Sequence, residues 1–467
     1  MFKTQAPAPS SALALTSSDL LAIAGAECLR LNPLLYMQPT FEEQFKYALS
    51  QTLAPYTSED TALIEDVVET ALDLFYQFVA PPRSFNTTFC RSTVDTERSR
   101  VVDTERSRVV DTERSRAVDT ERSRAVDTER SRVVDTERSR AQIQFLQSVP
   151  QPEQRTAAWY AFRHEHLTAS NIWKAFGTPA ARNQLIYEKC QPHQAAKFNG
   201  VSTETPMHWG QRYEPLSVRL YEEMYGGQIS DFGCIPHPQP QLNFLAASPD
   251  GINTDERNPR YGRMLEVKNI YNREIDGVPK LEYWVQMQMQ MEVCDLDESD
   301  FLETRFKEYE TESEFLADAL DDDCSNCTRM GEHKGLILYF MQADKPFYEY
   351  SPLSNTCLTF ADLTKWETET MERHIQLSWM KTIYWRLDEV SCVLVPRNRF
   401  WFAAAQPVLA ELWAIIEKEK VDGFEHRAPA KRVVKEKEKE KDKEKEKEKK
   451  RGPETGHKCI FEFRPLC

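Results

Sequence analysis

The sequence predicts a mixed α/β domain between residues 142 and 425, on two observations. The segment has 284 residues, enough to bury one large hydrophobic core. Within it, three runs are typical of strands, 244–247, 263–270 and 335–342, whereas 215–225 is typical of a helix and 384–418 of a pair of helices. The expected architecture is therefore a sheet with helices packed on it.

An internal repeat precedes this domain. From Val94 to Ala141 the octad V-D-T-E-R-S-R-(V/A) occurs six times. Eight residues at about 100° each turn the apolar pair by about 80° per copy, so no fixed apolar stripe can form on a helix. We therefore expect a linker, either a solvated helix or a disordered chain, that anchors no core. An array of partner-binding sites is the alternative.

The C-terminal residues form a charged tail. Between Lys431 and Arg451 there are 12 Lys and Arg and 7 Asp and Glu residues, a net charge of +5. Alternating Lys and Glu places like charges four residues apart, which favours a disordered segment over a helix. The chain as a whole carries −15 and the octads are neutral, so the remainder carries −20. This charge disfavours a protein that coats DNA, and any nucleic-acid site needs a local basic groove.

The N-terminal residues predict a small helical domain without assignable chemistry. Helical patterns occupy Asp19–Leu31, Phe41–Leu53 and Glu59–Phe78, and Pro81-Pro82 ends the last of them. The expected organisation is a helical accessory domain (1–90), the octad linker (91–141), the α/β domain (142–425) and the tail (426–467).

Membrane and secreted proteins are disfavoured by the pattern of apolar residues. No window reaches the roughly 18 uninterrupted apolar residues of a membrane span, because Gln406, Pro407 and Glu411 break the best candidate, Phe400–Ile416. The first residues lack the pattern of a secretory signal. Eleven scattered cysteines are typical of free thiols in a reducing compartment. We therefore expect a soluble intracellular protein.

Two short segments bring together residues suited to phosphodiester cleavage. "LAASPDG" (245–251) predicts a strand that ends in a turn with Asp250 at the bend. "RMLEVKNI" (263–270) predicts a strand that projects Glu266 and Lys268 from one face. The turn-rich residues between them favour a hairpin, which would place Asp250 beside Glu266.

Two carboxylates beside a lysine suit divalent-metal chemistry. Their hard oxygens bind a magnesium ion that keeps several waters. Such an ion stabilises charge on the scissile phosphate and lowers the pKa of a bound water. Lys268 would orient that water or stabilise the phosphate oxygens. An ordinary hairpin with a surface Glu/Lys pair is the alternative interpretation.

A third segment, "YWVQMQMQMEVC" (283–294), is ambiguous between strand and helix. The Gln/Met alternation is typical of a strand, whereas Trp284 and Met287 share a helical stripe. In a helix Gln286 and Gln290 would share a face and reach a metal-bound water or a phosphate. A core helix with its polar residues turned outward is equally consistent with the pattern.

In order, S-P-D-G, L-E-V-K and Y-W-x-Q-x-Q-x-Q-M resemble the motifs of the YqaJ-type viral recombinases. This family is similar to lambda exonuclease and belongs to the PD-(D/E)xK nucleases. The resemblance spans about 150–425, and residues 266–292 further resemble copies encoded by large DNA viruses. It implies a restriction-endonuclease-like fold, a mixed sheet flanked by helices, with a Mg²⁺ cofactor or alternatively Mn²⁺.

The resemblance also implies site roles. Asp250, Glu266 and the Val267 carbonyl would hold the metal, Lys268 would activate water, and Gln286 would orient it. Glu214 would assist in the metal shell. We expect Glu214 at a helix start because Pro215 suits a first helical position, with Gly226-Gly227 ending that helix. A glutamate favoured by the helix dipole is the alternative.

Residues 155–177 are similar to the family's W-x-x-x-R…T-A-S opening. This implies that Arg163 and Ser170 bind the 5′ phosphate of a DNA end, with Arg182 as a further contact. A guanidinium forks onto a phosphate, and a serine near a helix start adds a donor. Taken alone, Arg163 would be a surface residue and Ser170 a helix cap.

Cys324-x-x-Cys327 with His333 raises the question of a zinc or iron–sulfur site. The pair is single and lies in an acidic loop, and Cys357 and Cys392 form no second pair at zinc spacing. We therefore expect no iron–sulfur cluster.

The function favoured by the sequence is a magnesium-dependent 5′-to-3′ deoxyribonuclease that resects linear duplex DNA for recombination or repair. The expected partners are double-stranded DNA ends, a single-strand-annealing protein and further copies of the chain, with no membrane. If the protein is viral, the host cytoplasm or the viral replication site is its expected location. The alternatives are an endonuclease or flap nuclease on the same fold, and a catalytically silent DNA-binding or scaffold protein.

Overall fold

The structure is a computed structural model. It describes residues 41–53, 68–72, 75–76, 137–193, 203, 205–321, 323–343, 345–354 and 356–429. The first five octads, the Lys/Glu tail and the predicted helix Asp19–Leu31 lie outside these residues.

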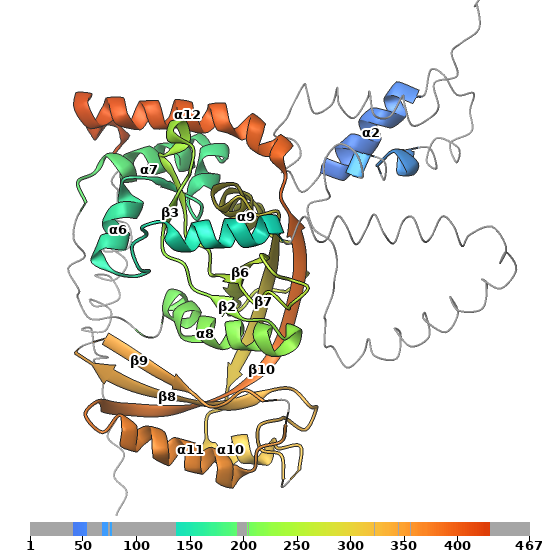
Figure 1. Ribbon diagram of the computed structural model, residues 1–467, viewed down its shortest axis with the longest axis vertical. Coiled ribbons are helices and arrows are strands. Elements are labelled where there is room, and N and C mark those ends of the chain that lie inside the picture. Colours follow the sequence, from blue (N-terminus) through green and yellow to red (C-terminus); the bar gives the residue numbers. More distant parts are fainter. Residues whose placement is uncertain are drawn as a thin grey trace, which may run out of the picture.

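A mixed sheet of seven strands, counted over the described residues, forms the centre of the domain (Figure 1). The strand order is β2-β5-β6-β7-β10-β8-β9; β6 and β7 are parallel and the other neighbours antiparallel. The strands are β2 (Ile229–Ser230), β5 (Gly251–Asn253), β6 (Met264–Asn269), β7 (Glu298–Glu308), β8 (Lys334–Gln342), β9 (Lys345–Tyr350) and β10 (Ser378–Pro396). The predicted fold class, a mixed sheet flanked by helices, is confirmed, and β8 matches the predicted strand at 335–342.

Strand β10 joins two halves of this sheet. Its first part pairs with β8 and its second part with β7. The sequence predicts a helix pair over 384–418, and the first of these helices is wrong. Trp385 and Leu387, then Val393 and Val395, are buried at alternate positions, a period that suits a strand. Only Arg399–Asp422, helix α12, is helical there.

Helices cover both faces of the sheet. One core cluster joins β6 and β7 to α7, α9 and α12, and a second packs α8 against the other face. The remaining elements include a small sheet in the order β1-β4-β3. Their bounds are α6 (Ala157–His164), β1 (Leu167–Thr168), η3 (Ile172–Phe176), α7 (Pro179–Cys190), α8 (Pro206–Tyr225), β3 (Ile235–Pro236), η4 (Pro240–Leu242), β4 (Leu245–Ala247), α9 (Leu281–Cys294), α10 (Glu312–Ala317), α11 (Phe360–Arg373) and η5 (Glu425–Arg427).

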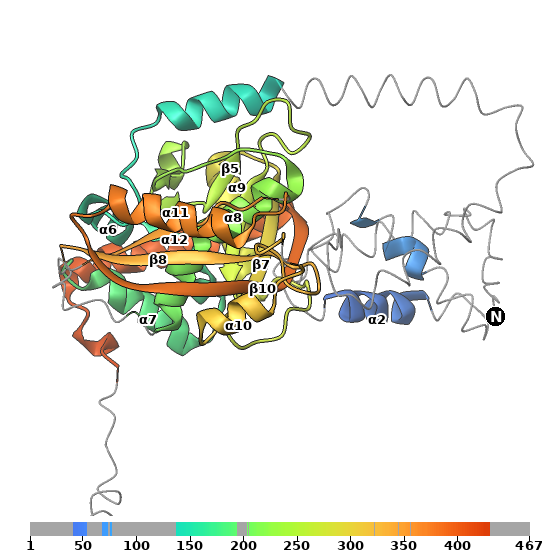
Figure 2. The same ribbon diagram turned by 90° about the horizontal axis from the view of Figure 1, so that it is seen from below.

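The two faces explain how β6 presents its side chains. Leu265 and Val267 belong to the cluster under α8, whereas Met264 belongs to the cluster under α9. Side chains alternate along a strand, so Glu266 also faces α9. Its contact with Gln290 of α9 agrees with this placement. The ambiguous segment 283–294 is therefore a helix, α9 (Figures 1 and 2).

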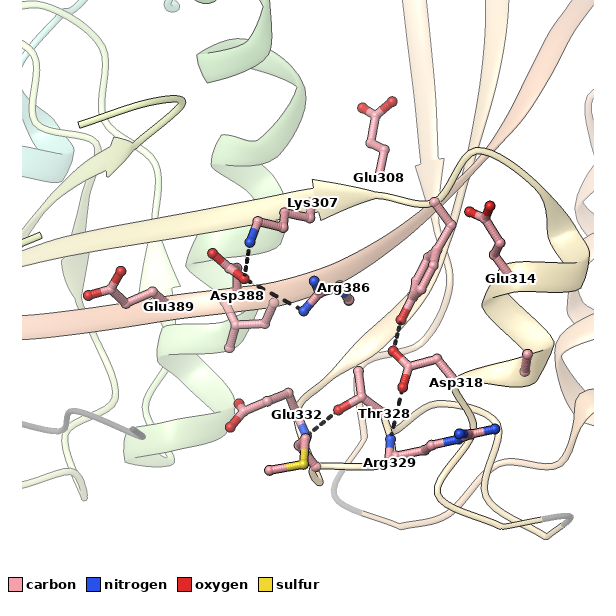
Figure 3. Close-up of a pocket in the computed structure, with 14 residues that line it drawn as sticks. Lys307, Glu308, Glu314, Asp318, Thr328, Arg329, Glu332, Arg386, Asp388 and Glu389 are labelled. Atoms are coloured by element: carbon pink, nitrogen blue, oxygen red, sulfur yellow. Dashed lines mark hydrogen bonds and ion pairs between the residues drawn. The ribbon is translucent and has the colours of Figure 1, made fainter. Parts of the chain in front are cut away.

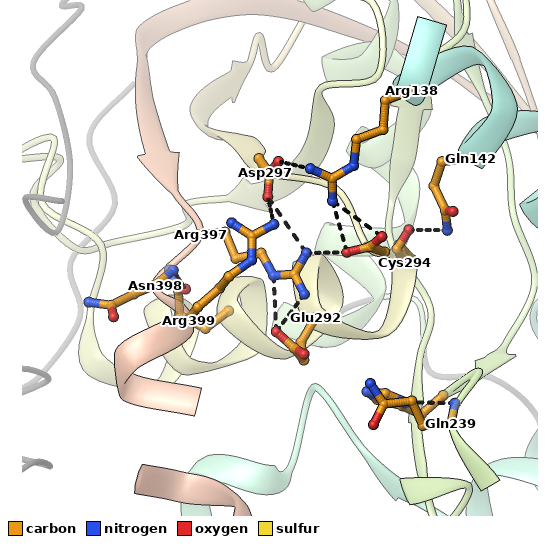
Figure 4. Close-up of polar contacts among 12 residues, drawn as sticks. Arg138, Gln142, Gln239, Glu292, Cys294, Asp297, Arg397, Asn398 and Arg399 are labelled. Carbon is orange, nitrogen blue, oxygen red and sulfur yellow. Dashed lines mark hydrogen bonds and ion pairs between the residues drawn. The ribbon is translucent and has the colours of Figure 1, made fainter. Parts of the chain in front are cut away.

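A helix over residues 137–148 lies against the end of α9 (Figure 4). It begins in the last octad, where Arg138 pairs with Asp295 at 3.3 Å and Asp297 at 3.5 Å. Its buried apolar residues, Ile143 and Leu146, follow the repeat rather than belonging to it. The described part of the last octad thus adds surface ion pairs and no buried apolar side chain.

In the N-terminal segment, helix α2 (Phe41–Leu53) coincides with the predicted helix. Phe45 and Phe75 pack with ring centroids 4.8 Å apart. Within the predicted helix Glu59–Phe78, residues 68–72 and 75–76 are helical, and the rest lies outside the described residues. The domain boundaries stay predictions.

Candidate active site

The turn that carries Asp250 lies directly beside β6. Gly251 pairs with Leu265 in the β5–β6 register, and the Asp250 Oδ2 accepts a hydrogen bond of 2.8 Å from the Val267 N–H. A Cβ atom on Gly251 would lie 2.1 Å from a methyl of Ile229, so this close approach requires glycine. The predicted neighbourhood of Asp250 and β6 is therefore present. The strand that pairs with β6 here is β5, which follows Asp250. The sequence predicted that the strand before Asp250 would pair with β6.

Glu266 is fully buried and held from two sides. Its Oε1 pairs with the Lys268 ammonium, and its Oε2 accepts a 2.7 Å hydrogen bond from Gln290 Nε2. Burial lowers the pKa of Lys268, but the neighbouring carboxylates of Glu266 and Asp250 outweigh burial and raise it. Lys268 is therefore protonated at neutral pH. Its ammonium also lies 5.0 Å from the centroid of the Tyr283 ring.

Burial raises the pKa of Asp250 well above its usual range, and the charge of Glu266 raises it further. Lys268 and the Val267 N–H act in the opposite direction without reversing the shift. A second ionised carboxylate beside Glu266 is thus disfavoured in the metal-free chain, and such strongly shifted acids are often found at functional sites.

Glu214 is the third acid near this cluster. Burial raises its pKa, and Arg155, Lys268 and Glu266 all act on it electrostatically. Its position in α8 differs from the prediction, since the helix begins at Pro206 with Thr205 as its cap and carries Pro215 internally. Thr205-Pro206 is the stronger start signal, because it supplies both a capping hydroxyl and a proline in the first turn. The helix ends at Gly226, as predicted, and this glycine is in a left-handed conformation.

The donor set suits a hard divalent cation, although the arrangement is not closed around one. Among the residues that the structure describes, no group of three or more His, Cys, Asp and Glu side chains could hold a metal ion. Asp250 and Glu266 nevertheless offer carboxylate oxygens, which such ions prefer. In addition, the Gln290 Oε1 is buried without a hydrogen-bond partner in the described chain, so an acceptor beside Glu266 is unused.

The two residues predicted to bind phosphate are in contact. Arg163 Nη2 donates a 2.7 Å hydrogen bond to the Ser170 hydroxyl, and the guanidinium stacks 4.3 Å above the Trp159 ring. The Trp159 indole N–H in turn donates to the Ser248 hydroxyl at 3.0 Å. Ser248 precedes Asp250 by two residues, so a short chain of contacts connects Arg163 to the acidic cluster.

Two other predicted residues lie elsewhere. Gln286 is half-buried on α9, and it is Gln290, one helical turn later, that contacts Glu266. Arg182 of α7 forms an exposed ion pair of 3.0 Å with Glu411 of α12, a different partner from the predicted phosphate-binding residues. The roles of Gln286 and Arg182 stay predictions.

Residues 158–297 match the profile of the YqaJ-like viral recombinase domain. Over these residues the chain is similar to the YqaJ-like viral recombinase domain. Every residue assigned to the site from the sequence, from Arg163 to Gln286, falls inside the matched range. The match is shorter than the resemblance predicted over 150–425, and it ends before β7.

Known proteins show further similarity to the chain. The uncharacterized protein R354 of Acanthamoeba polyphaga mimivirus is 28% identical over 311 residues, which cover 58% of this chain. The matched part is 54% of that protein, so the chain spans about half the length of this curated relative. Part of this chain is thus similar in sequence to a viral protein.

Two crystal structures of an alkaline exonuclease, LHK-Exo, also align with the chain. One is from Laribacter hongkongensis, with 19% identity and a TM-score of 0.32; the other is a complex with dAMP, with 18% identity and a TM-score of 0.31. Each alignment covers 57% of this chain and 94% of the exonuclease chain.

Two residues that contact the predicted site residues, Arg155 and Lys189, were not predicted from the sequence. Arg155 pairs with Glu214 at 2.8 Å from outside the matched range of the YqaJ-like domain, and no spacing rule connects the two. Lys189 is buried and donates a 2.6 Å hydrogen bond to the Arg163 carbonyl. Burial, reinforced by the charge of Arg163, lowers the pKa of Lys189 to about 7. A lone lysine in the last turn of a helix gives no sequence signal of burial.

The CxxC loop lies apart from this site. Cys327 and His333 form an isolated β-bridge, and the Cys324 thiol donates to the Asn326 side chain at 3.5 Å. These cysteines, like the others among the described residues, are free thiols.

A pocket at the far end of β7 contains none of the predicted site residues (Figure 3). Six acidic side chains and three basic ones line it, a balance that disfavours a nucleic-acid backbone. The acids are Glu308, Glu314, Asp318, Glu332, Asp388 and Glu389, and the bases are Lys307, Arg329 and Arg386.

Over the residues described, none of the helices combines the length and the apolar character that crossing a bilayer requires.

Proposed function

We propose that this chain is a divalent-metal-dependent deoxyribonuclease that digests linear double-stranded DNA from the 5′ end. The observation that carries the proposal is the cluster at β6, where Asp250 lies against the Val267 N–H and Glu266 is buried between Lys268 and Gln290. The match of residues 158–297 to the YqaJ-like viral recombinase domain supports a nuclease of this type.

Asp250 and Glu266, with the Val267 carbonyl, would hold a magnesium or manganese ion. When bound, the ion supplies positive charge to the scissile phosphate and makes water a better nucleophile. Lys268 keeps its proton at neutral pH, so its role is to donate hydrogen bonds to the phosphate oxygens or the attacking water rather than to accept a proton. Gln290 positions Glu266 through its Nε2 and keeps a buried, unused amide oxygen.

The contacts of Arg163 support an end-directed mode. A terminal phosphate bound by Arg163 and Ser170 would sit close to the acidic cluster, because Trp159 links Arg163 to Ser248, two residues before Asp250. A site that holds the terminal phosphate a short distance from the cleavage centre favours cutting near an end over cutting internally. The implied partners are duplex ends and, for recombination, a protein that anneals the exposed single strand.

The proposal is tested with the full chain and three DNA substrates, in magnesium and in excess chelator. We expect rapid digestion of a linear duplex with 5′ phosphates, slower digestion after the phosphates are removed, and none of a covalently closed circle. All digestion should stop in chelator. Cleavage of the circle would replace the exonuclease with an endonuclease, and equal rates on the two linear substrates would remove Arg163 and Ser170 from the site.

Binding without any cleavage would favour the silent scaffold protein. To exclude a contaminating nuclease, Lys268→Ala is purified and assayed in parallel. Lys365→Ala serves as a matched control, because Lys365 is exposed on α11 and only forms a 3.9 Å pair with Glu369. The control should digest DNA as the unaltered chain does.

A further inference from the structure

Arg155 occupies a constrained position at the edge of the acidic cluster. Its backbone is left-handed, with φ of 65°, which is uncommon for a residue other than glycine. On one side, Gln154 Nε2 donates to the carbonyls of Phe232 and Pro249, the residue before Asp250. On the other side, Thr156 caps α6. Both neighbours are fixed, so the turn at Arg155 is held in place by its surroundings.

This conformation directs the Arg155 side chain to Glu214. One guanidinium nitrogen, Nη2, lies 2.9 Å from Oε1 and 2.8 Å from Oε2 of the carboxylate. Both oxygens that Glu214 would offer to a metal ion are therefore engaged by a protein cation. The Arg155 side chain is 44% exposed and that of Glu214 29% exposed, so solvent reaches the pair from the open side.

We propose that Arg155 is a positioning residue that competes with the divalent cation for Glu214. In the absence of the ion, Arg155 keeps Glu214 paired, and the ion must displace the guanidinium before Glu214 can join Asp250 and Glu266. This inference rests on the proposed function, because it presupposes a metal ion at the acidic cluster.

The contrast with Lys268 supports competition at Arg155. Lys268 lies on the same strand as Glu266, and its ammonium is packed near the Tyr283 ring, so it stays beside the site. Arg155 reaches Glu214 from another segment, and its exposed guanidinium can turn into solvent or toward a phosphate. A surface-accessible ion pair of this kind is weak, which makes it replaceable by a divalent ion.

A simpler role for Arg155 predicts the opposite result. If Arg155 only anchors Glu214 in a metal-ready position, then removing its side chain should weaken metal binding. If Arg155 competes, removal should tighten it. The sign of the change in affinity therefore decides between the two roles.

Manganese binding to the full chain is measured by isothermal titration calorimetry without DNA. We expect Arg155→Gln to bind manganese about two- to fivefold more tightly than the unaltered chain, and Arg155→Lys to lie between the two. In a Glu214→Gln background, Arg155→Gln should change nothing, because the contested carboxylate is gone. Arg138→Gln is the matched control, since Arg138 forms exposed ion pairs at the end of α9.

Folding is checked by thermal unfolding, and Arg155→Gly provides a second variant suited to the left-handed backbone. It should bind manganese as tightly as Arg155→Gln. Equal or weaker binding by both variants would overturn the competition while leaving the metal centre intact. Failure of the unaltered chain to bind manganese at all would instead overturn the proposed function, and this inference with it.

Discussion

Two clusters of acidic residues flank α9, and their electrostatics differ. At its C-terminal end, Glu292, Asp295 and Asp297 meet Arg138, Arg397 and Arg399, a cluster in which three guanidiniums face three carboxylates (Figure 4). There, hydrogen bonds and charge from Arg397 outweigh burial and lower the pKa of Asp295.

The cluster beside β6 shows the reverse, since burial and neighbouring carboxylates raise the pKa of Asp250. The comparison separates two kinds of site. An acidic cluster balanced by arginines holds segments together, whereas the buried carboxylates beside β6 are the ones that we propose bind a cation from outside the chain. The acidic residues alone do not distinguish them, but their partners do.

The strongest test of this contrast is Lys268→Ala. We expect digestion of linear duplex DNA to fall on the order of a thousandfold, because a positioned donor to the phosphate is lost. Folding and DNA binding, measured by thermal unfolding and by fluorescence anisotropy in chelator, should change little. Retention of full activity would remove Lys268 from the chemistry.

The next largest effect distinguishes Gln290 from Gln286. Since Gln290 donates to Glu266 at 2.7 Å, Gln290→Leu should lower the single-turnover rate roughly ten- to a hundredfold. Gln286→Leu should have a smaller effect on the same assay. A larger loss from Gln286→Leu would restore the role that the sequence predicts for that residue.

These glutamines illustrate how far the sequence reaches. The alternating pattern of 263–270 and the turn at Asp250 predicted that Asp250 lies beside the strand of Glu266, because strand period and turn chemistry are local properties. The sequence could not decide which of Gln286 and Gln290 contacts Glu266. That contact depends on the point along α9 at which the helix crosses β6. The strand at 384–396 was missed for the same reason, because its conformation is decided by pairing with β8 at its start and with β7 along the rest.

The proposed phosphate site shows the same division. Arg163 and Ser170 followed from a motif, whereas Lys189 and Arg155 were not anticipated because burial and a left-handed turn are consequences of tertiary packing. The start of α8 was misplaced because Pro215 competed with the better signal at Thr205-Pro206.

Lys189 supplies a test by pH. Its pKa is lowered to about 7 by burial and by the charges of Arg163 and Lys420, with Glu188 and Cys234 acting in the opposite direction. Between about pH 7 and 9 the unfolded chain binds the proton that the folded chain releases, so stability should rise with pH. Relative to Lys189→Met, the free energy of unfolding should rise by about 2 kcal/mol across this window. Parallel pH curves for the two proteins would contradict the shift.

A smaller effect compares the two clusters directly. Asp250→Asn should raise the free energy of unfolding of the metal-free chain by about 1 kcal/mol, because it removes repulsion beside Glu266. Asp295→Asn should lower it by a similar amount, because Arg397 and Arg138 lose a partner at a half-exposed site. Denaturant unfolding measures both, and shifts of the same sign would erase the distinction between the clusters.

The smallest expected effect concerns the last octad. Arg138→Gln should destabilise the domain by at most about 0.5 kcal/mol, since its ion pairs with Asp295 and Asp297 are half-exposed. Ile143→Ala should lower the free energy of unfolding by about 2 kcal/mol or more, because Ile143 lies on the buried face of the same helix. Comparable losses in the two variants would show that the repeat contributes more than surface pairing.

The location of a bound metal ion tests the central claim most directly. Crystals grown with manganese, examined by anomalous scattering, should show an ion between the carboxylates of Asp250 and Glu266. Glu214 should then be released from Arg155. Manganese bound only at the balanced cluster of Asp295 and Asp297, or absent beside β6 at saturating concentration, would contradict the account.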